Sequence, residues 1–289
     1  MNGIINVLKP PGMTSHDVVG YLRKVTGIKK IGHTGTLDPG AAGVLPICIG
    51  KATKIVDYIM NDRKEYICEL TLGNATDTYD KYGEFLYDQE LDYSSITEND
   101  MLSALEAFNG DITQIPPAYC AVKINGVRAY DLARQGKEVQ VPSRRVTIYK
   151  AELLSFDSPR AMLRIECSKG TYIRSICNDI GIKLGSRAYM SFLLRTRTGR
   201  FTLENAVTLE EIGSGSVEKM LMDAGFGLDM KEIYLEEETS RFILNGNSIE
   251  INQNGFRQDE LVKVYIKPCS FTAIGRVRAS RLYIEKLMV

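Results

Sequence analysis

Asp38 is the side chain whose surroundings most suggest chemistry. It lies in the stretch from Gly32 to Lys54, which reads GHTGTLDPGAAGVLPICIGKATK, and it stands directly before Pro39. A proline restricts the preceding residue to extended conformations, and the flanking glycines allow another chain or a ligand to come close. The apolar run from Val44 to Ile49 predicts a short buried strand after the turn. A polar turn tied to a core strand is a rigid mount for a reactive group.

Two other interpretations of this stretch compete with that one. Asp-Pro between glycines often forms only a surface turn, and composition alone favours that interpretation. Gly50-Lys51 also resembles the end of a phosphate-binding Walker A motif. The spacing excludes this motif, because Leu45 occupies the place of its first glycine and Ala52 stands where a hydroxyl group would bind magnesium.

The composition of the 289-residue chain is that of an ordinary globular protein, with 44% hydrophobic and 25% charged residues. The length indicates one large domain, or one domain with a smaller companion. No apolar run approaches the roughly 20 residues of a membrane helix, and the first residues do not resemble a signal peptide. We therefore expect a soluble, cytoplasmic protein.

A metal site built by the protein is not expected. The two histidines are His16 and His33, and the six cysteines contain no C-x-x-C pair. The thiols are therefore predicted to be reduced residues of the core. Any chemistry is expected to proceed without a metal.

The charges are segregated along the chain, although the net charge is zero. Ten acidic residues and one base lie between Thr71 and Tyr119, whereas sixteen bases and six acidic residues lie between Ala121 and Arg200. This segregation predicts a basic face that could contact phosphates, although charged runs are more often only solvated surface.

The periodicity of apolar residues predicts the strands and helices that hold the polar residues. Strands are expected at Gly3 to Lys9, in the run YICELTLG from Tyr66, and from Ala161 to Cys167. One helix is expected after Ser15, which could act as its N-cap, and Gly27 would end it.

Two more helices are predicted further along the chain. Thr97 and Asp100 form a capping box for a helix that Gly110 would end. The other helix is expected from Ile173 to Gly185, and it would place Tyr172 and Arg174 at a strand-to-helix junction, where the helix dipole favours negative charge.

Composition sets two further regions apart. Residues 114–150 combine arginines and lysines with tyrosines and glycines, which is typical of a hairpin and short helix that project and grip a nucleic-acid backbone. Glycines and serines before residue 230 predict a boundary, and five short strand-like runs follow it. We therefore predict a larger domain of residues 1–229 and a small β domain of residues 230–289.

Four long segments resemble the motifs of a known family, the bacterial tRNA pseudouridine synthases of the TruB type. They are the Asp38 loop and the segments KEYICELTLGNATDTYDKYG, IPPAYCAVKINGVRAYDLARQG and KGTYIRSICNDIG. The C-terminal piece is similar to a short PUA domain, which is an RNA-binding module. The resemblance covers most of the chain. It implies an α+β fold with a mixed, largely antiparallel central sheet and an active cleft across its middle.

By this resemblance the reaction is the isomerisation of uridine to pseudouridine at position 55, in the TΨC loop of tRNA. The bond from the ribose to N1 breaks, the uracil turns, and a bond to C5 forms. This requires a carboxylate, a group that removes the C5 proton and a dry pocket for the base. It requires no metal, redox cofactor or ATP.

The implied partner is the T-arm of tRNA. Because the target uridine lies inside a folded loop, the protein must extrude it before the chemistry. Basic residues of segment 114–150 and the cluster of Arg195, Arg197 and Arg200 are expected to hold the RNA stem by its phosphates, as are Lys29 and Lys30 before the Asp38 loop. The protein is expected to act as a monomer that requires no protein partner.

The resemblance assigns the chemistry to three residues. Asp38 matches the catalytic aspartate and Arg174 matches the arginine that pairs with it, which predicts a buried ion pair between them. Tyr66 matches a tyrosine that stacks on the uracil and that could assist removal of the C5 proton. Whether Asp38 attacks C1′ of the ribose or C6 of the base stays open.

Five further residues match substrate-binding positions of the family. Tyr172 and Leu193 match residues that line the base pocket. His33 matches a histidine beside the extruded base, where a neutral imidazole would stack. Asp80 matches a polar contact to the base, and Lys54 matches a supporting residue.

Two other functions are compatible with parts of the sequence. A non-catalytic RNA-binding or tRNA-folding protein would account for the basic segment and the PUA-like tail. A hydrolase of the glycosidase type would use Asp38 with a second acid, such as Asp77 or Asp80, and would release free uracil. The hydrolase does not account for the order of the four motifs.

Overall fold

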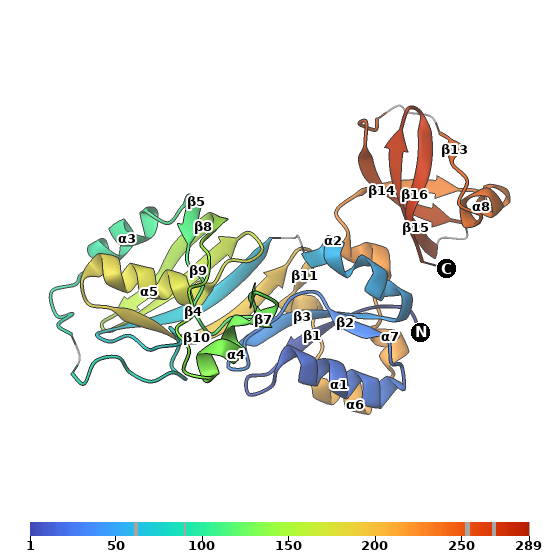
Figure 1. Cartoon of the computed structure of the whole chain (residues 1–289). Coiled ribbons are helices and arrows are strands. Elements are labelled where there is room, and N and C mark those ends of the chain that lie inside the picture. The colour runs from blue at the N-terminus through green and yellow to red at the C-terminus, as the bar shows by residue number, and fades with distance from the viewer. Residues whose placement is uncertain (61–62, 90, 252–254, 268–269, 289) are drawn as a thin grey trace.

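The chain folds around one large and one small β-sheet. The computed structural model describes residues 1–60, 63–89, 91–251, 255–267 and 270–288. The large sheet follows the strand order β1-β3-β10-β4-β9-β8-β5, with β2 paired to β3 and β11 paired to β10. Its neighbouring strands run antiparallel, except for β3 and β10, which run parallel. The predicted α+β class with a mixed, largely antiparallel sheet is confirmed (Figure 1).

The three predicted strands are present in the large sheet. β1 (Gly3–Lys9) has the predicted bounds, whereas β4 (Lys64–Leu72) and β9 (Arg160–Cys167) begin slightly earlier than expected. The other strands are β2 (Ile31–His33), β3 (Ala42–Ile49), β5 (Gly110–Gln114), β8 (Arg144–Asp157), β10 (Ala188–Thr198) and β11 (Phe201–Thr202). Buried and half-buried residues alternate along β4, because successive side chains of a strand point to opposite faces.

Helices α1 (Ser15–Thr26) and α5 (Ile173–Leu184) end where the sequence predicts, at glycines in the left-handed conformation. The predicted N-cap of α1 is wrong by one residue. Thr14 caps the helix and accepts a hydrogen bond from the Asp17 amide, whereas Ser15 lies inside the helix and bonds to Leu37 instead.

Helix α3 (Glu98–Glu106) begins with the predicted capping box of Thr97 and Asp100. It ends four residues before Gly110, which instead begins β5. The remaining short helices of the first 229 residues are η1 (Gly50–Ile55), α2 (Val56–Met60), α4 (Ala129–Arg134), η2 (Leu203–Asn205), α6 (Leu209–Ser214), α7 (Val217–Met220) and η3 (Ala224–Gly227). In the described part of the chain, no helix has the length and apolar character needed to span a membrane.

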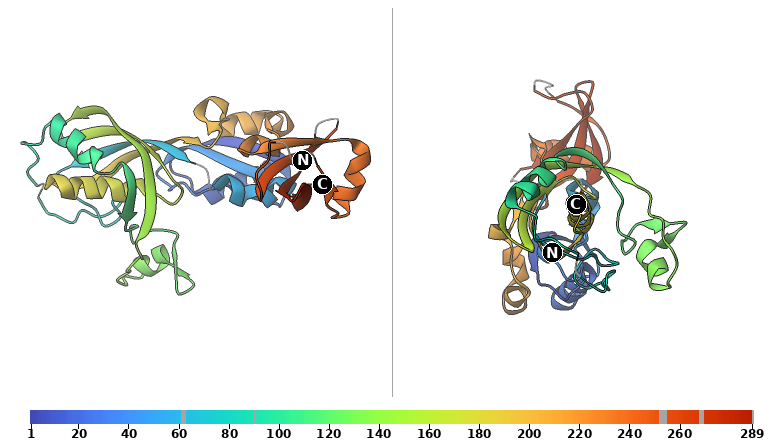
Figure 2. Two further views of the ribbon diagram at one scale, coloured as in Figure 1. Left: turned by 90° about the horizontal axis from the view of Figure 1, so that it is seen from above. Right: turned by 90° about the vertical axis from the view of Figure 1, so that its left-hand side faces the viewer.

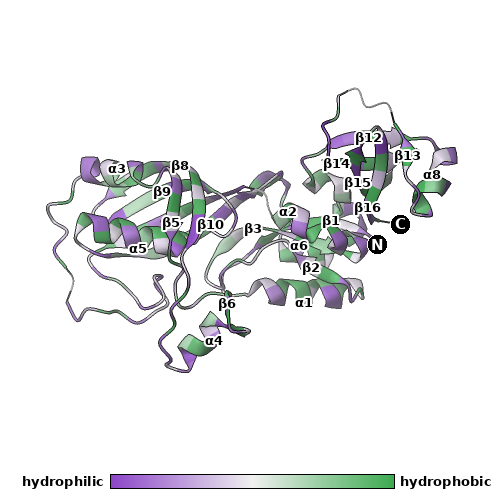
Figure 3. Cartoon of the chain, turned by 45° about the horizontal axis from the view of Figure 1, so that its top comes forward, coloured by the Kyte–Doolittle hydropathy of each residue, from purple (hydrophilic) through white to green (hydrophobic). Residues whose placement is uncertain are grey.

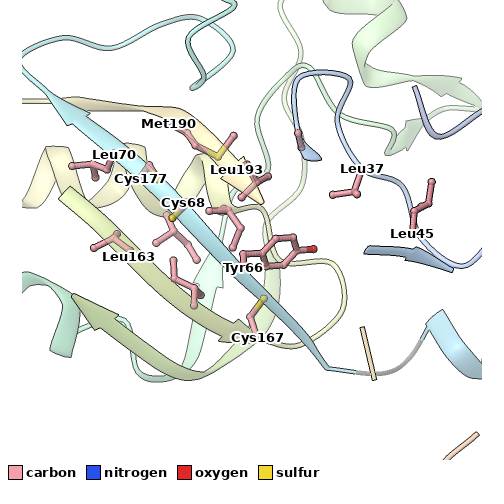
Figure 4. Close-up of a cluster of buried hydrophobic side chains, with 14 of the residues drawn as sticks. Leu37, Leu45, Tyr66, Cys68, Leu70, Leu163, Cys167, Cys177, Met190 and Leu193 are labelled. Atoms are coloured by element: carbon pink, nitrogen blue, oxygen red, sulfur yellow. The ribbon is translucent and has the colours of Figure 1, made fainter. Parts of the chain in front are cut away.

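The main core lies between the large sheet and the helices that pack on it. Apolar side chains of β4, β9 and β10 meet those of α5, and Figure 4 shows Cys68, Leu70 and Cys177 within this cluster. Apolar and polar residues are interspersed along most elements, as expected where one face of each is buried (Figure 3). This core supports the middle strands of the sheet, on which the candidate site is built.

The chain leaves the sheet after Gln114, the last residue of β5, as a separate projection, and we call residues 114–143 the insertion (Figure 2). It contains the hairpin of β6 (Lys123–Ile124) and β7 (Val127–Arg128), followed by α4. The hairpin and short helix are as predicted. The end of the predicted segment is wrong, because residues 144–150 belong to β8 of the large sheet, where the apolar side chains of Val146 and Ile148 are buried.

The small sheet is built by residues after the predicted boundary. Its strand order is β12-β14-β15-β16-β13, from β12 (Lys231–Leu235), β13 (Ile249–Glu250), β14 (Glu260–Ile266), β15 (Ser270–Arg278) and β16 (Arg281–Leu287), with α8 (Glu237–Leu244) beside it. A shared apolar cluster joins the two sheets and includes Phe271 and Ile274 of β15 together with Ile4 of β1 and Val44 of β3.

Candidate functional site

Asp38 lies in the loop between β2 and β3, and hydrogen bonds fix this loop on both sides. Before Asp38, the Leu37 amide donates to Ser15 Oγ at 2.8 Å, and the Ser15 hydroxyl donates to the Leu37 carbonyl at 3.2 Å. After it, the Ala41 amide donates to the Asp38 carbonyl at 3.0 Å. The turn is therefore held as the rigid mount that the sequence predicts.

Arg174 lies in the first turn of α5, and its guanidinium contacts Asp38 at two points. Nε lies 2.9 Å from Oδ2, and Nη2 donates to Oδ1 at 3.3 Å. Residues 136 positions apart in the chain are brought together here. A planar guanidinium that meets both carboxylate oxygens fixes the direction in which the carboxylate points.

The ion pair is buried on one side only. The Arg174 side chain is 6% exposed, whereas the Asp38 side chain is 38% exposed. The predicted buried ion pair is therefore correct for the arginine and wrong for the carboxylate, because Asp38 projects from a loop above the sheet and not from the sheet itself. An open side is where a substrate atom would approach.

Asp80 shares the same arginine. Its Oδ2 lies 3.4 Å from Arg174 Nη1, while Oδ1 accepts hydrogen bonds from the Thr78 hydroxyl and the Tyr82 amide. Arg174 also donates to the Thr78 carbonyl at 3.0 Å. Asp80 thus positions Arg174 and joins the loop of residues 76–83 to the Asp38 loop.

Tyr66 and Leu193 extend from the neighbouring strands β4 and β10, and both are 7% exposed. Figure 4 shows the two side chains close together, with the Tyr66 ring directed toward the loop that carries Leu37. Burial raises the pKa of Tyr66 to about 12, although Arg195 opposes this shift. Tyr66 therefore stays a neutral phenol at neutral pH, which suits stacking better than proton removal.

His33 and Tyr172 belong to different elements, β2 and the start of α5. His33 ends β2, its Nδ1 accepts from the Gly35 amide at 3.3 Å, and burial together with the Arg195 charge lowers its pKa. The imidazole is therefore neutral at pH 7, as expected for stacking. Tyr172 forms the N-cap of α5, and Asp38 is among the charges that act on its hydroxyl.

The structure does not bring Lys54 into contact with the other predicted residues. It lies in η1 on the side of the small sheet, and its Nζ donates to the Leu287 carbonyl at 2.6 Å. This hydrogen bond links η1 to β16 of the small sheet.

Two buried cations hold the Asp38 loop, and sequence reasoning missed both of them. Lys9 is 0% exposed, and its Nζ donates to the carbonyls of Pro10, Pro39 and Ala41. Arg195 is 1% exposed, and it donates to the carbonyls of Gly35, Thr36 and Val44. The loop is held by Lys9 from β1 and by Arg195 from β10.

The prediction that Arg195 contacts RNA phosphates is wrong, because its guanidinium is turned into the protein. A signal for this was present in the sequence. Leu193 was predicted to line the base pocket, and a period of two along a strand places Arg195 on the same face. The burial of β10 follows that pattern at both positions.

The described thiols belong to the core, as predicted. Cys48, Cys68, Cys120, Cys167 and Cys177 are free and buried, whereas Cys269 lies outside the described residues. Burial raises the pKa of Cys48 and of Cys167 to about 12, so neither is a thiolate at neutral pH. Among the residues that the structure describes, no three histidine, cysteine or acidic side chains are grouped so that they could hold a metal ion.

Comparison with known proteins gives matches over most of the chain. Residues 23–173 match the model of the TruB family pseudouridylate synthase (N terminal domain), and residues 174–224 match the tRNA pseudouridylate synthase B C-terminal domain. The tRNA pseudouridine synthase B of Clostridioides difficile (strain 630) is 47% identical over 288 residues, which cover 96% of this chain and 95% of the relative. The tRNA pseudouridine synthase B of Clostridium tetani (strain Massachusetts / E88) is 45% identical, and the match covers 100% of both chains.

Solved structures extend the likeness to the whole fold. A chain in the crystal structure of a Cbf5-Nop10-Gar1 complex matches with a TM-score of 0.75 and 25% identity, over 99% of this chain and 85% of that chain. A chain in the structure of an H/ACA RNP bound to a substrate RNA containing 2′-deoxyuridine has a TM-score of 0.74 at 24% identity. Since these matches cover both sheets, the small sheet belongs to the shared fold, although the second family match ends at residue 224.

Proposed function

The chain belongs to the TruB family of pseudouridylate synthases, and we propose that it isomerises the uridine at position 55, in the TΨC loop of tRNA, to pseudouridine. The observation that carries this proposal is the Asp38 carboxylate, held at two points by a buried Arg174 and open on one side. Tyr66 and Leu193 supply an apolar face for a detached base. These are the groups that the reaction requires.

The reaction is balanced without a co-reactant. The C1′–N1 bond breaks, the uracil rotates in the pocket, C1′ bonds to C5, and the proton lost from C5 is replaced by one at N1. Asp38 acts as the nucleophile or as the proton acceptor in this sequence. Arg174 keeps its carboxylate oriented while the bound RNA displaces water from the open side.

The polar and aromatic residues around Asp38 hold the base. Tyr66 stacks on the uracil as a neutral phenol, since its pKa is raised to about 12. Leu193 closes the apolar side of the pocket, and His33 and Tyr172 contact the extruded nucleotide from either side. Asp80, which lies beside Arg174, makes a polar contact to the bound RNA.

The insertion is proposed to grip the T-arm next to this pocket. Arg128 and Arg134 are exposed, and their guanidinium carbons lie 5.8 and 5.5 Å from the centre of the Tyr130 ring. Arg174 donates to the Tyr119 carbonyl at 3.1 Å, which joins the insertion to the catalytic arginine. The small PUA-like sheet extends the RNA surface, and the protein acts as a monomer without a protein partner.

The geometry favours this function over a hydrolase with two acids. A glycosidase needs one carboxyl group that is protonated and aimed at the leaving group. Asp80, the second acid near Asp38, instead contacts the same guanidinium and accepts two further hydrogen bonds. These contacts occupy both of its carboxylate oxygens, so Asp80 is not aimed at a leaving group.

A T-arm minihelix tests the proposal directly. The wild-type protein converts its target uridine to pseudouridine, detected by carbodiimide labelling, and releases no free uracil. Asp38→Asn lowers the rate by about 10⁴-fold or more, as expected for loss of a nucleophile. It keeps RNA binding, because the loop and Arg174 remain. RNA that is bound but never modified by the wild type would show a non-catalytic binding protein, and turnover by Asp38→Asn would remove Asp38 from the mechanism.

A further inference from the structure

Arg195 is the largest side chain of the fully buried set, and it lies under the candidate site. It extends from β10 at a point where its backbone pairs with Gly43 of β3 and with Tyr66 of β4. Its guanidinium therefore lies between the strand that follows the Asp38 loop and the strand that carries the stacking tyrosine.

The contacts of Arg195 close the base of the Asp38 loop. Nε donates to the Val44 carbonyl at 2.7 Å, Nη2 to the Gly35 carbonyl at 3.2 Å and Nη1 to the Thr36 carbonyl at 3.4 Å. These carbonyls lie on both sides of Asp38 in the chain. One rigid, planar group thus fixes the distance between the two ends of the loop.

Tyr66 is the cross-strand neighbour of Arg195. The two residues pair across β10 and β4, and paired residues of antiparallel strands extend their side chains to the same face of the sheet. The Arg195 charge opposes the rise that burial causes in the pKa of Tyr66. Arg195 therefore lies between the Asp38 loop and the stacking tyrosine.

In the described part of the chain, no carboxylate lies within ion-pair distance of Arg195. Its donors are instead met by the backbone carbonyls of the loop and of β3. Burying a cation in this way is costly unless its donors are satisfied. Arg174, in contrast, is shared by two carboxylates. Arg195 and Lys9 are thus the two buried cations that contact the loop through its carbonyl groups.

We propose that Arg195 is a positioning residue of the reaction, which fixes the position of the Asp38 loop relative to the Tyr66 ring. It touches neither the RNA nor the reacting atoms. It acts through the loop carbonyls and the phenol. The distance between the Asp38 carboxylate and the stacked base therefore stays constant while the uracil rotates. This inference rests on the proposed function.

The test separates positioning from folding and from RNA binding. We expect Arg195→Met to lower the single-turnover rate of pseudouridine formation by about 100-fold, as for a misplacement of about 1 Å. Arg195→Lys keeps the positive charge but lacks the planar guanidinium with its several donors. It restores the rate to within about tenfold of wild type. Binding is measured with a T-arm RNA that carries cytidine at the target position, and both its Kd and its salt dependence stay at the wild-type values. Arg164→Gln, which removes a surface arginine of β9, is the matched control and behaves as wild type.

A double-mutant cycle with Tyr66→Phe identifies the route of the effect. If Arg195 acts through the phenol, Tyr66→Phe slows turnover by itself, and Arg195→Lys costs less in that background than in the wild type. Additive losses, a wild-type rate for Arg195→Met, or a weaker Kd with a reduced salt slope would each overturn the proposal. If the arginine variants do not fold, the rate of Tyr66→Phe decides, and a wild-type rate counts against the inference. Failure of the wild type to form pseudouridine would instead refute the proposed function.

Discussion

The Asp38 loop, residues 33–44, and the insertion, residues 114–143, both face the candidate site, but they are held in different ways. The loop is held by two buried cations that donate to its backbone carbonyls. The insertion has a small apolar cluster of its own, with Cys120, Ala129 and Val141 as its buried members. Many contacts per residue fix the first region, and few fix the second.

The difference indicates a division of labour. Catalysis needs reacting groups held to within a fraction of an ångström, whereas a grip on phosphates tolerates many arrangements. The insertion meets the site through the Tyr119 carbonyl, which accepts from Arg174, and the Ile115 carbonyl, which accepts from Ser175. At its first residue, the Gln114 side chain hydrogen-bonds to the backbone of Tyr172. We therefore expect changes in the loop to affect the rate, and changes in the insertion to affect binding.

Substitution of Arg174 is expected to have the largest effect, because this side chain contacts both the Asp38 loop and the insertion. Arg174→Ala leaves Asp38 and Asp80 without their shared cation, and it should lower the rate by about 10³-fold. It should also lower the free energy of unfolding by about 2 kcal/mol, a value reduced because Asp38 is 38% exposed. Quenched-flow kinetics and urea unfolding measure the two effects. Arg174→Lys, which keeps the charge but not the fork, should recover more stability than rate; equal recovery of both would contradict the geometric role.

Two glycines of the Asp38 loop provide a matched pair of stability predictions. A Cβ at Gly43, whose φ is +120°, would lie 2.2 Å from the Arg195 carbonyl oxygen in the backbone of β10. A Cβ at Gly40 would instead meet the Tyr82 ring, which is 65% exposed and free to turn away. We expect Gly43→Ala to cost at least about 3 kcal/mol and Gly40→Ala less than about 1 kcal/mol. Similar midpoints of thermal unfolding for the two variants would show that the loop is less rigid than its contacts indicate.

Much of the fold and part of the site could be predicted from the sequence. The bounds of β1 and α5 follow from local periodicity and a terminal glycine, and the pairing of Asp38 with Arg174 follows from matched motifs. The burial of Arg195 was not predicted, because an arginine followed closely by two more resembles an exposed basic cluster. The alternation along β10 places it on the face of Leu193, and the long-range pairing of β10 with both β3 and β4 sets that strand in the middle of the sheet.

The exposure of Asp38 and the place of Lys54 could not be predicted for a related reason. A motif states which residues recur together, but it does not state how far a loop rises above the sheet or which neighbour a lysine meets. Lys54 meets the Leu287 carbonyl, which lies 233 residues away in the chain. Such contacts depend on how the two sheets pack, and local patterns carry no information about that packing.

Substitutions in the insertion should change RNA binding and leave the single-turnover rate unchanged. Arg128→Ala and Arg134→Ala each remove one exposed cation, so each should reduce the slope of log Kd against log salt by about 0.7 to 0.9. The single-turnover rate at saturating RNA should stay within about twofold of wild type, since neither side chain contacts the Asp38 loop. Glu138→Gln, which removes an exposed negative charge from the same region, is the matched control and should tighten binding slightly. A change in rate with an unchanged slope would place these arginines in the catalytic geometry.

The smallest expected effect is a pH dependence of stability that comes from Lys9, which holds the loop from β1. Burial lowers the pKa of Lys9 from 10.5 to about 8, although attraction to Asp38 opposes the shift. The unfolded chain therefore binds more protons than the folded chain between these two values, and Lys9 makes the free energy of unfolding rise with pH across that window. Other groups titrate there as well, so the quantity to measure is the difference in unfolding free energy between wild type and Lys9→Met at pH 7.5 and at pH 10. The free energy of unfolding of the wild type should rise relative to that of Lys9→Met as the pH rises. A constant difference would mean that the three carbonyls hold Lys9 fully charged in the folded protein.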